Sequence, residues 1–529
     1  MAGAAQMTPP AWLAVYVVAS FLAFPHPIGD RVLDLGLGLA WLAPAALLLG
    51  LEGLTIRRAA WRGFLASLAA HSAILHWIYV VTVEYGHAPA AVGVLAPVVL
   101  AAYIAAFGAA FGAGAACFAR AGFVSPFAAA LLWTAIDHLR SFAFSGFPWA
   151  TIGYAQHDNQ LLLPLASLGG VYTLSFVSVL GGASLARVVR LRRLDAAAAS
   201  GFAAVALAHA VGFALGASEA DESGLARVRV AVLQGNIDQG VKWSPEWAGR
   251  TLAIYEDLSR RAAAQGARVI VWPETAVPAP IADGQQTEAR LAGLARETGA
   301  SLVVGAVGLD FGPDATLVGV TDSAFVFEPS GALVHRYDKT HLVPFGEYVP
   351  FQDLLGRWFR AVARGIAEIG VTAGDRPRAL RFAVPGATPE LTAGVPICYE
   401  LLFPELTRRF VRDGAQLLFA ITNDAWYGRT GAPFQFLAIT ALRSAETRVW
   451  TARAANSGVS AIIDARGRVR QRTRIFERAL LVEDVTLRPA PFGGSFYARF
   501  GDVFAGVCWL GTLGWLLLAW RRTRREILD

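Results

Sequence analysis

The stretch Gly394–Glu400, GVPICYE, decides how the remainder of this 529-residue chain is interpreted. Residues 389–393 predict a strand that runs into a turn, and residues 401–405 predict the start of a helix with Pro404 in its first turn. Cys398 is therefore expected at a strand-to-helix elbow, where converging backbone N–H groups and the helix dipole favour a reactive thiolate. The alternative is a small buried apolar residue, which is what a free cysteine usually is.

The composition indicates a protein of the lipid bilayer with more than one folding unit. Hydrophobic residues make up 55% of the chain and charged residues only 16%, against about 25% charged residues in an average soluble protein. The net charge is +6, but the arginines cluster at the ends of apolar runs, and no basic stripe carries interleaved aromatic residues. Nucleic acid is therefore not an expected partner. Two of the three cysteines lie inside apolar runs, which argues against a disulfide scaffold.

Eight apolar runs predict membrane-spanning helices, some of them shortened or interrupted by glycine and proline. They cover residues 11–24, 33–51, 63–83, 91–118, 127–139, 161–185, 201–217 and 503–520. With eight spans, the arginine clusters at 57–62, 187–193 and 521–525 all fall on one side of the membrane. The positive-inside rule assigns that side to the cytoplasm, so both termini are expected there. The long segment before the last span is then extracytoplasmic.

The chain is accordingly divided into three parts. We expect a transmembrane region over 1–218 with seven spans, an extracytoplasmic catalytic domain over 225–495, and an eighth span with a basic cytoplasmic tail over 500–529. The middle part alternates short β-branched runs with helical patterns, which is typical of a layered α/β domain. The expected strands are 228–233, 269–272, 302–307, 323–327, 391–397, 416–421, 459–463 and 480–482, and the expected helices are 245–265, 286–298 and 434–446.

Two further loops carry candidate catalytic residues. Glu274 follows an apolar strand and a proline in WPET, residues 272–275, so semi-dry surroundings are expected to raise its pKa toward that of a general base. An ordinary exposed loop carboxylate is the alternative. Lys339 lies in YDKTHLVPFGE, residues 337–347, and is one of only two lysines in a chain with 46 basic residues. A chain that uses arginine almost everywhere else indicates a need for a compact ammonium at this position.

Glutamate, lysine and cysteine together form a complete acyl-transfer apparatus. The carboxylate takes the thiol proton, the thiolate attacks a carbonyl carbon, and the ammonium with an elbow N–H group stabilises the oxyanion. His341 is a rival base, in a Cys–His pairing. Glu274 is preferred, in part because of the resemblance described next.

WPET, YDKTHLVPFGEYVP, PICYE and NDAWYG resemble the carbon–nitrogen hydrolase (nitrilase) superfamily. With the membrane helices and the stretches FPWATIGYAQ and LQGNIDQGVKW, the chain resembles the apolipoprotein N-acyltransferase family of bacterial envelopes. The resemblance implies an α-β-β-α sandwich carried on a transmembrane helical bundle, with Glu274 as general base, Lys339 as oxyanion stabiliser and Cys398 as acylated nucleophile. It further implies supporting or substrate-binding roles for Glu347, Tyr399, Glu400, Trp243 and Trp426.

Some of these supporting roles have structural alternatives. The two tryptophans also suit interfacial anchors, and Glu400 suits a carboxylate favoured by a helix N-terminus. One stretch departs from the family: where members tend to carry a Tyr-Asn-Ser type sequence, this chain has Val320–Ser323, VTDS. A polar contact carried over to that stretch is therefore in doubt.

The resemblance implies a ping-pong reaction. Cys398 takes a fatty acyl chain from a phospholipid as a thioester and passes it to the α-amine of the diacylglyceryl-cysteine of an apolipoprotein, at the outer face of the bacterial inner membrane. No metal and no cofactor are expected. Residues 351–369 carry an apolar stripe with interleaved arginines, which predicts a lid on the lipid headgroups. A membrane-tethered amidase or nitrilase and a non-catalytic scaffold are the alternative functions.

Overall fold

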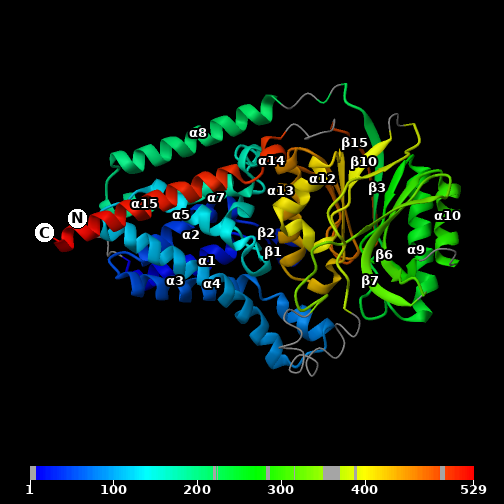
Figure 1. The fold of residues 1–529 in the computed structure, drawn as a ribbon, viewed down its shortest axis with the longest axis horizontal. Coiled ribbons are helices and arrows are strands. Elements are labelled where there is room, and N and C mark those ends of the chain that lie inside the picture. Colours follow the sequence, from blue (N-terminus) through cyan, green and yellow to red (C-terminus); the bar gives the residue numbers. More distant parts are fainter. Residues whose placement is uncertain are drawn as a thin grey trace.

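The computed structural model describes residues 7–218, 222, 224–281, 286–314, 316–348, 370–386, 390–488 and 495–528. A bundle of helices occupies one end of the molecule and a two-sheet sandwich the other, and the helices run roughly along the line that joins the two parts (Figure 1). The segment 351–369, predicted to be a lid, lies outside the described residues.

The helices of the bundle come from both ends of the chain. They are α1 (Pro9–Leu22), α2 (Gly36–Gly50), α3 (Ile56–Ile74), α4 (Ala90–Arg120), α5 (Pro126–Arg140), α7 (Val171–Leu191), α8 (Ala196–Ser218) and α15 (Val503–Leu528). Helices α3 and α4 approach closely because small residues face one another: a Cβ added at Gly63 would lie 2.5 Å from the Gly108 carbonyl oxygen. The end of α15 and the start of α1 lie at the end of the bundle remote from the sandwich (Figure 1).

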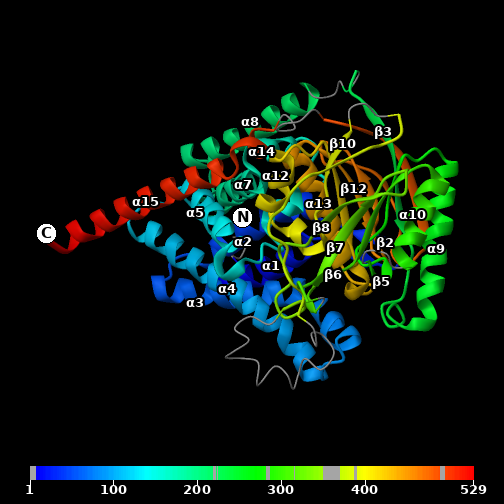
Figure 2. The ribbon, with the colours of Figure 1, turned by 45° about the vertical axis from the view of Figure 1, so that its right-hand side comes forward.

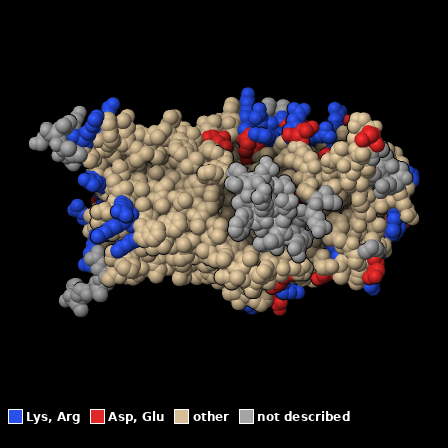
Figure 3. Space-filling model, turned by 60° about the horizontal axis from the view of Figure 1, so that its bottom comes forward, with Lys and Arg blue, Asp and Glu red and all other residues tan. Residues whose placement is uncertain are grey.

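Four helices among the described residues are long and apolar enough to cross a membrane: Ala90–Arg120, Val171–Leu191, Ala196–Ala217 and Val503–Arg524. Helices α1 and α2 are apolar but shorter. The sixth predicted span, 161–185, begins at Val171 instead, because Gly170 adopts a φ of +67° and separates α7 from the short helical turns before it. On the face drawn in Figure 3, a belt without charged side chains separates the basic end of the bundle from the charged sandwich. The chain thus forms a membrane protein with several apolar helices.

Two mixed sheets face each other in the sandwich. In the first sheet the order is β15 (Ala479–Thr486), β3 (Arg227–Gln234), β4 (Val269–Val271), β6 (Ser301–Phe311), β7 (Leu317–Phe327) and β8 (Leu333–Asp338), with β5 (Val277–Ile281) also paired to β6. In the second it is β14 (Val469–Arg472), β13 (Ala461–Ile463), β12 (Trp450–Ala455), β11 (Leu417–Thr422), β10 (Leu391–Gly394) and β9 (Leu380–Phe382). The central strands β3, β4 and β6, and likewise β10, β11 and β12, are parallel.

Helices cover both outer faces of this pair of sheets. Helices α9 (Pro245–Ala264) and α10 (Gln286–Thr298) pack on the first sheet, and α12 (Pro404–Arg412) and α13 (Ala432–Thr447) lie between the second sheet and the bundle (Figures 1 and 2). This α-β-β-α arrangement confirms the predicted sandwich. Each predicted strand and helix of the domain overlaps an observed one, but the pattern did not predict the strands β5, β8, β9, β12 and β14.

The loop after α5 joins the bundle to the sandwich. Trp149 is 1% exposed and donates from Nε1 to Gln435 Oε1 on α13 (2.8 Å). Arg140, at the end of α5, donates to the Trp149 carbonyl oxygen at 2.8 Å and so orients this loop. Tyr399 donates from its hydroxyl to the Gly146 carbonyl oxygen at 3.4 Å, which brings the Cys398 elbow against the same loop. The candidate site therefore lies at the junction of the two parts.

Candidate active site

The WPET loop leaves the end of β4 and turns Glu274 toward the second sheet. Glu274 is 5% exposed, and its Oε2 accepts a hydrogen bond from the Asn423 backbone N–H, just beyond β11, at 2.6 Å. The loop passes so close to β6 that a Cβ at Gly305 would lie 2.2 Å from the Pro273 carbonyl oxygen. Glu274 is thus a buried, fixed carboxylate and not an exposed loop residue.

Lys339 follows β8 and places its ammonium among three carboxyl groups. Its Nζ lies 3.2 Å from Glu274 Oε1, 3.3 Å from Asp322 Oδ2 and 2.5 Å from Glu347 Oε1, and its side chain is fully buried. Glu347 also accepts the Val343 backbone N–H at Oε2 (2.8 Å). We call Lys339, Glu274, Asp322 and Glu347 the Lys339 cluster. The three carboxyl groups are arranged as ligands of a cation, and the ammonium of Lys339 is the cation they share.

The pKa of Glu274 moves opposite to the sequence-based expectation. Burial raises this pKa, but Lys339, a hydrogen bond with Asp322, and Lys242 outweigh burial and hold it below its usual value. The ammonium of Lys339 in turn has a pKa well above its usual range, because burial is outweighed by Glu347, Glu274 and Asp322. At neutral pH the pair is therefore a carboxylate and an ammonium.

Cys398 lies at a strained elbow between β10 and a 3-10 turn, Cys398–Leu402. Its φ is +46°, a left-handed conformation that a residue with a Cβ adopts rarely and mostly at functional sites. Burial and the charge of Glu274 raise the pKa of the Cys398 thiol well above its usual value, while Lys339 lowers it. The elbow therefore does not favour the thiolate, contrary to the expectation from the sequence, and the thiol is protonated at rest. The reason is structural, since α12 begins only at Pro404 and no long helix starts at the sulfur atom.

Glu400 fastens the lysine loop to the cysteine elbow. One carboxylate oxygen accepts hydrogen bonds from Tyr337 Oη, Thr340 N and Thr340 Oγ1, each at 2.7 Å, and the other accepts Ile397 N at 2.8 Å. These donors are chain neighbours of Lys339 and Cys398. Glu400 is fully buried and holds the two loops at a constant separation, a more specific arrangement than a carboxylate at a helix N-terminus.

His341, the rival candidate for the general base, packs against two aromatic side chains. Its ring stacks on Tyr399 with centroids 5.6 Å apart and lies 4.0 Å from the centroid of Phe403. Burial, together with the nearby ammonium of Lys339, lowers the pKa of His341 to about 4. What separates the two candidates is geometry: the ring of His341 packs between Tyr399 and Phe403, whereas the carboxylate of Glu274 is held beside Lys339.

The two predicted tryptophans occupy different surroundings. Trp243 is 49% exposed and lies over the ammonium of Lys242, with Nζ 5.7 Å from its ring centroid. Trp426 follows β11 and contacts Tyr85 with ring centroids 5.9 Å apart. Tyr85 belongs to a π-helical segment, Val80–Tyr85, between α3 and α4. Trp426 therefore lies where the bundle meets the sandwich.

Three residues of the site were not selected from the sequence. Lys242 is 1% exposed and donates to Thr275 Oγ1 at 2.5 Å, beside Glu274, so both lysines of the chain lie at this site. Burial lowers the pKa of Lys242 to about 8. Asp322 belongs to the stretch that departs from the family, and Asn423 precedes the DAWYG turn. The scarcity of lysine was a usable signal for Lys242, the motif NDAWYG for Asn423, and the departure VTDS for Asp322, but no role was assigned to any of the three.

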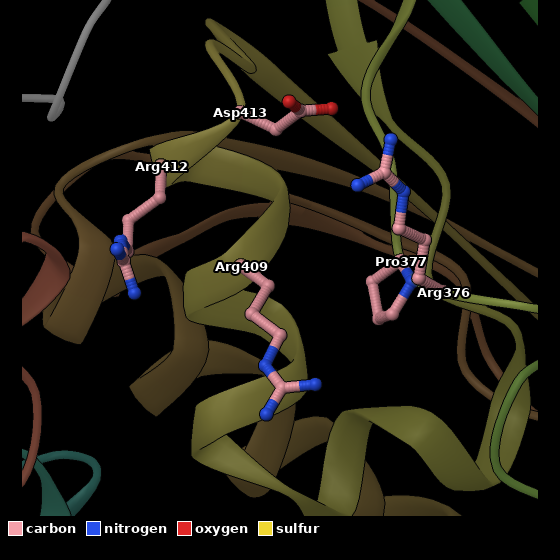
Figure 4. A pocket seen from close by; sticks show the side chains of 5 residues that line it. All are labelled: Arg376, Pro377, Arg409, Arg412 and Asp413. Atoms are coloured by element: carbon pink, nitrogen blue, oxygen red, sulfur yellow. The ribbon is translucent and has the colours of Figure 1, made fainter.

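A cavity of about 310 Å³ opens elsewhere in the sandwich. Arg376, Pro377, Arg409, Arg412 and Asp413 line it (Figure 4). Two of its arginines and its carboxylate come from the end of α12 and the turn after it (Figure 4). No member of the Lys339 cluster lines this cavity, so the cavity is not the candidate active site.

Comparison with known proteins places both parts of the chain. Residues 229–489 match the family model described as carbon-nitrogen hydrolase, and residues 9–184 match the apolipoprotein N-acyltransferase N-terminal domain. The apolipoprotein N-acyltransferase of Geobacter metallireducens is 39% identical over 95% of this chain and 93% of its own length. That of Azotobacter vinelandii is 33% identical over 94% of each chain. Among solved structures, an amidase from Nesterenkonia sp. AN1 aligns over 53% of this chain and 99% of its own, with 19% identity and a TM-score of 0.37. The chain belongs to the apolipoprotein N-acyltransferase family.

Proposed function

We propose that this protein transfers a fatty acyl chain from a phospholipid to the α-amine of the N-terminal diacylglyceryl-cysteine of a lipoprotein, through a thioester on Cys398. The single observation that carries the proposal is that the buried pair of Glu274 and Lys339 acts electrostatically on Cys398, a strained residue whose elbow contacts the helical bundle. The names of the relatives supply the acceptor class, and the apolar helices supply a route for a lipid donor.

In the first half-reaction Glu274 takes the proton of the Cys398 thiol while the sulfur attacks the ester carbonyl carbon. The C–S bond forms, negative charge develops on the carbonyl oxygen, and Lys339 stabilises that charge. Glu274 then returns its proton to the departing oxygen of the lysophospholipid. A thiol that is protonated at rest suits this order of events, because its proton is then available for transfer through Glu274 to the departing oxygen.

In the second half-reaction the lipoprotein amine attacks the thioester. Glu274 takes a proton from the attacking nitrogen, the C–N bond forms, and the C–S bond breaks. The thiolate of Cys398 regains its proton from Glu274, so the enzyme ends in its starting state. Glu347 keeps Lys339 in place throughout, Glu400 keeps the two loops together, and Trp243 and Trp426 border the route of the acyl chains.

The proposed topology has eight spans, with both termini in the cytoplasm and the catalytic domain on the periplasmic face of the inner membrane. The proposed parts are 1–218, 225–495 and 500–529. Basic residues at the end of the bundle remote from the sandwich support this orientation, because such residues are retained on the cytoplasmic side. The path of the chain also supports it, since α8 ends near the sandwich and α15 runs from near the sandwich to the remote end of the bundle (Figure 1).

Intact-protein mass spectrometry of the detergent-purified enzyme incubated with a phospholipid tests this function. The wild type should gain the mass of one fatty acyl group, which hydroxylamine removes and a diacylated lipopeptide clears. Cys398→Ser should not form a hydroxylamine-sensitive adduct, whereas Cys117→Ser, a free cysteine of α4, should behave like the wild type. Ammonia release from small amides or nitriles without any acyl adduct would overturn the proposal in favour of a tethered amidase.

A further inference from the structure

The Lys339 cluster contains one more carboxyl group than the proposed reaction uses. Asp322 lies on β7, is 8% exposed, and directs Oδ2 at the ammonium of Lys339 (3.3 Å). Its flanking residues face elsewhere: Ser323 Oγ donates to Asp338 Oδ1 at 2.5 Å, and Thr321 Oγ1 also lies 3.2 Å from that oxygen. Of these three neighbouring residues, only Asp322 directs its side chain at Lys339.

Two observations of geometry show that Asp322 is not an ordinary counter-ion. One carboxyl oxygen of Asp322 lies within 4.8 Å of one of Glu274, and two buried carboxyl groups this close can share a hydrogen bond only when one of them carries a proton. Its other oxygen, Oδ1, is buried and accepts no hydrogen bond from any described residue. A buried carboxylate oxygen without a donor is costly, whereas a protonated carboxyl group needs fewer donors.

The balance of charge agrees with one proton in the cluster. Three carboxylates face two buried ammonium groups, those of Lys339 and Lys242, so the site is neutral only if one carboxyl group is protonated. Burial and the adjacent carboxylate of Glu274 raise the pKa of Asp322 well above its usual value, whereas that of Glu274 is lowered. The proton therefore resides on Asp322. Among the described residues, the other titratable groups that act on Glu274 or Lys339 include Cys398, Asp424 and Tyr427, which follow strands of the second sheet, and His341 in the loop of Lys339.

We propose that Asp322 takes part in the reaction as a neutral carboxylic acid that donates a hydrogen bond to Glu274 and so acts as a positioning residue for the general base. This inference rests on the proposed role of Glu274. The donated hydrogen bond orients the carboxylate and keeps it ionised while the thiol proton is still on sulfur. Asp322 keeps its own proton throughout, so the thiol proton alone moves to Glu274 and onward to the leaving oxygen.

The matched variants are Asp322→Asn and Asp322→Ala. An asparagine can donate from Nδ2 to Glu274 and accept from Lys339 at Oδ1, which reproduces the protonated aspartic acid without a titrating group. Alanine removes both contacts. Asp310→Asn is the control, because Asp310 is a half-exposed partner of Arg336 in the neighbouring strand β6 and lies outside the cluster.

Infrared difference spectroscopy reads the proton directly and needs no substrate. At neutral pH the wild type minus Asp322→Asn difference should contain the carbonyl band of a protonated carboxylic acid. The wild type minus Asp310→Asn difference should contain carboxylate bands instead. Loss of carboxylate bands in Asp322→Asn would overturn the proposal, even if the protein were shown to act on another substrate.

The pH profile of acyl-enzyme formation provides the second readout. The wild-type rate should fall as the pH rises through the pKa of Asp322, because the donor is lost, and Asp322→Asn should keep its rate there. Asp322→Ala should be roughly tenfold slower at neutral pH, with its acidic limb at higher pH, because the hydrogen bond that lowers the pKa of Glu274 is gone. An alkaline fall in Asp322→Asn like that of the wild type would contradict the proposal. Should the wild type form no acyl adduct, alkylation of Cys398 by iodoacetamide, followed by peptide mass spectrometry, replaces this assay.

Discussion

The sandwich buries positive charge in two ways. Arg453 on β12 meets a single carboxylate, with Nη2 2.7 Å from Asp424 Oδ2, and both side chains are fully buried. Its other two nitrogen atoms donate to the Val459 carbonyl oxygen and to Thr440 Oγ1. Lys339 is as deeply buried but meets three carboxyl groups and has no other acceptor among the described residues. The Arg453 site has one cation and one carboxylate, whereas the Lys339 site has three carboxyl groups around one cation.

This difference separates a structural ion pair from a site that can move protons. A planar guanidinium with a partner for each nitrogen has a fixed geometry and no titrating hydrogen within reach of neutral pH. When several carboxyl groups share one compact ammonium, the protonation of each carboxyl group depends on the protonation of the others. An unequal charge count is therefore a better sign of chemistry than burial alone.

The largest expected effect comes from Lys339→Met, which leaves three buried carboxyl groups without their cation. Acyl-enzyme formation should fall about 100- to 1,000-fold, as for the loss of an oxyanion donor. The variant should also lose stability as pH rises above about 4, because its carboxyl groups, with folded-state pKa values now raised, must ionise without a partner. Thermal unfolding at pH 5 and pH 8 checks the second part. Equal losses at both pH values would show that Lys339 does not compensate these charges.

Arg453→Met should act on stability and hardly on chemistry. Breaking a buried pair costs about 3–5 kcal/mol, and the double variant Arg453→Met/Asp424→Leu should recover most of it because no buried charge is left unpaired. Denaturant unfolding measures the loss, and acyl-enzyme formation per folded molecule should stay within about tenfold of the wild type, since the pair lies outside the Lys339 cluster. A loss of activity as deep as that of Lys339→Met would remove the distinction between the two sites.

Glu347→Gln should reduce the rate of acyl-enzyme formation by about 10- to 100-fold, because a hydrogen bond to a charged group contributes about 1.5–3 kcal/mol. Glutamine still accepts a hydrogen bond but no longer holds the ammonium by charge. Glu390→Gln is the matched control: its partner Arg381 is exposed, and such surface pairs contribute about 0–1 kcal/mol. A rate unchanged in Glu347→Gln would reduce Glu347 to a structural acceptor for the Val343 backbone N–H.

Lys242→Met should shift the acidic limb of the rate profile to higher pH. The ammonium of Lys242 lowers the pKa of Glu274, so its removal raises that pKa and the carboxylate is lost earlier on acidification. The two proteins should become alike as pH rises through about 8, where wild-type Lys242 itself loses its proton. Acyl-enzyme rates from pH 4 to pH 9 test both statements. Superimposable acidic limbs would exclude this influence of Lys242.

The smallest effect is expected for His341→Phe. Phenylalanine preserves the contacts with Tyr399 and Phe403, which are worth about 1 kcal/mol, so the rate should stay within about threefold of the wild type and melting should change little. A general base contributes about 100-fold or more. A loss of that size in this variant, measured as acyl-enzyme formation, would favour His341 over Glu274 as the base.

Much of the site could be selected from local sequence because each motif follows a strand of the sandwich. Glu274 follows β4 and Cys398 follows β10, and an apolar run that ends in a proline-containing turn is visible without a structure. The direction of the pKa of Glu274 could not be predicted, because it depends on lysines 32 residues before it and 65 residues after it. The thiol was misjudged for a similar reason: the local pattern marks a helix after the elbow but not the turn that separates Cys398 from it.

The sequence by itself determined the class of molecule, the strand and helix pattern of the sandwich, and the residue types that carry the proposed chemistry. These properties depend on composition, on hydrophobic periodicity and on residues next to strand ends, all of which are local. The tertiary structure alone decided which carboxyl groups share the ammonium, and that Glu400 joins the loops of Lys339 and Cys398. It alone decided that Asp322 faces Glu274. Electrostatic interactions act through space, so residues far apart in the chain set each other's protonation only after the two sheets have packed.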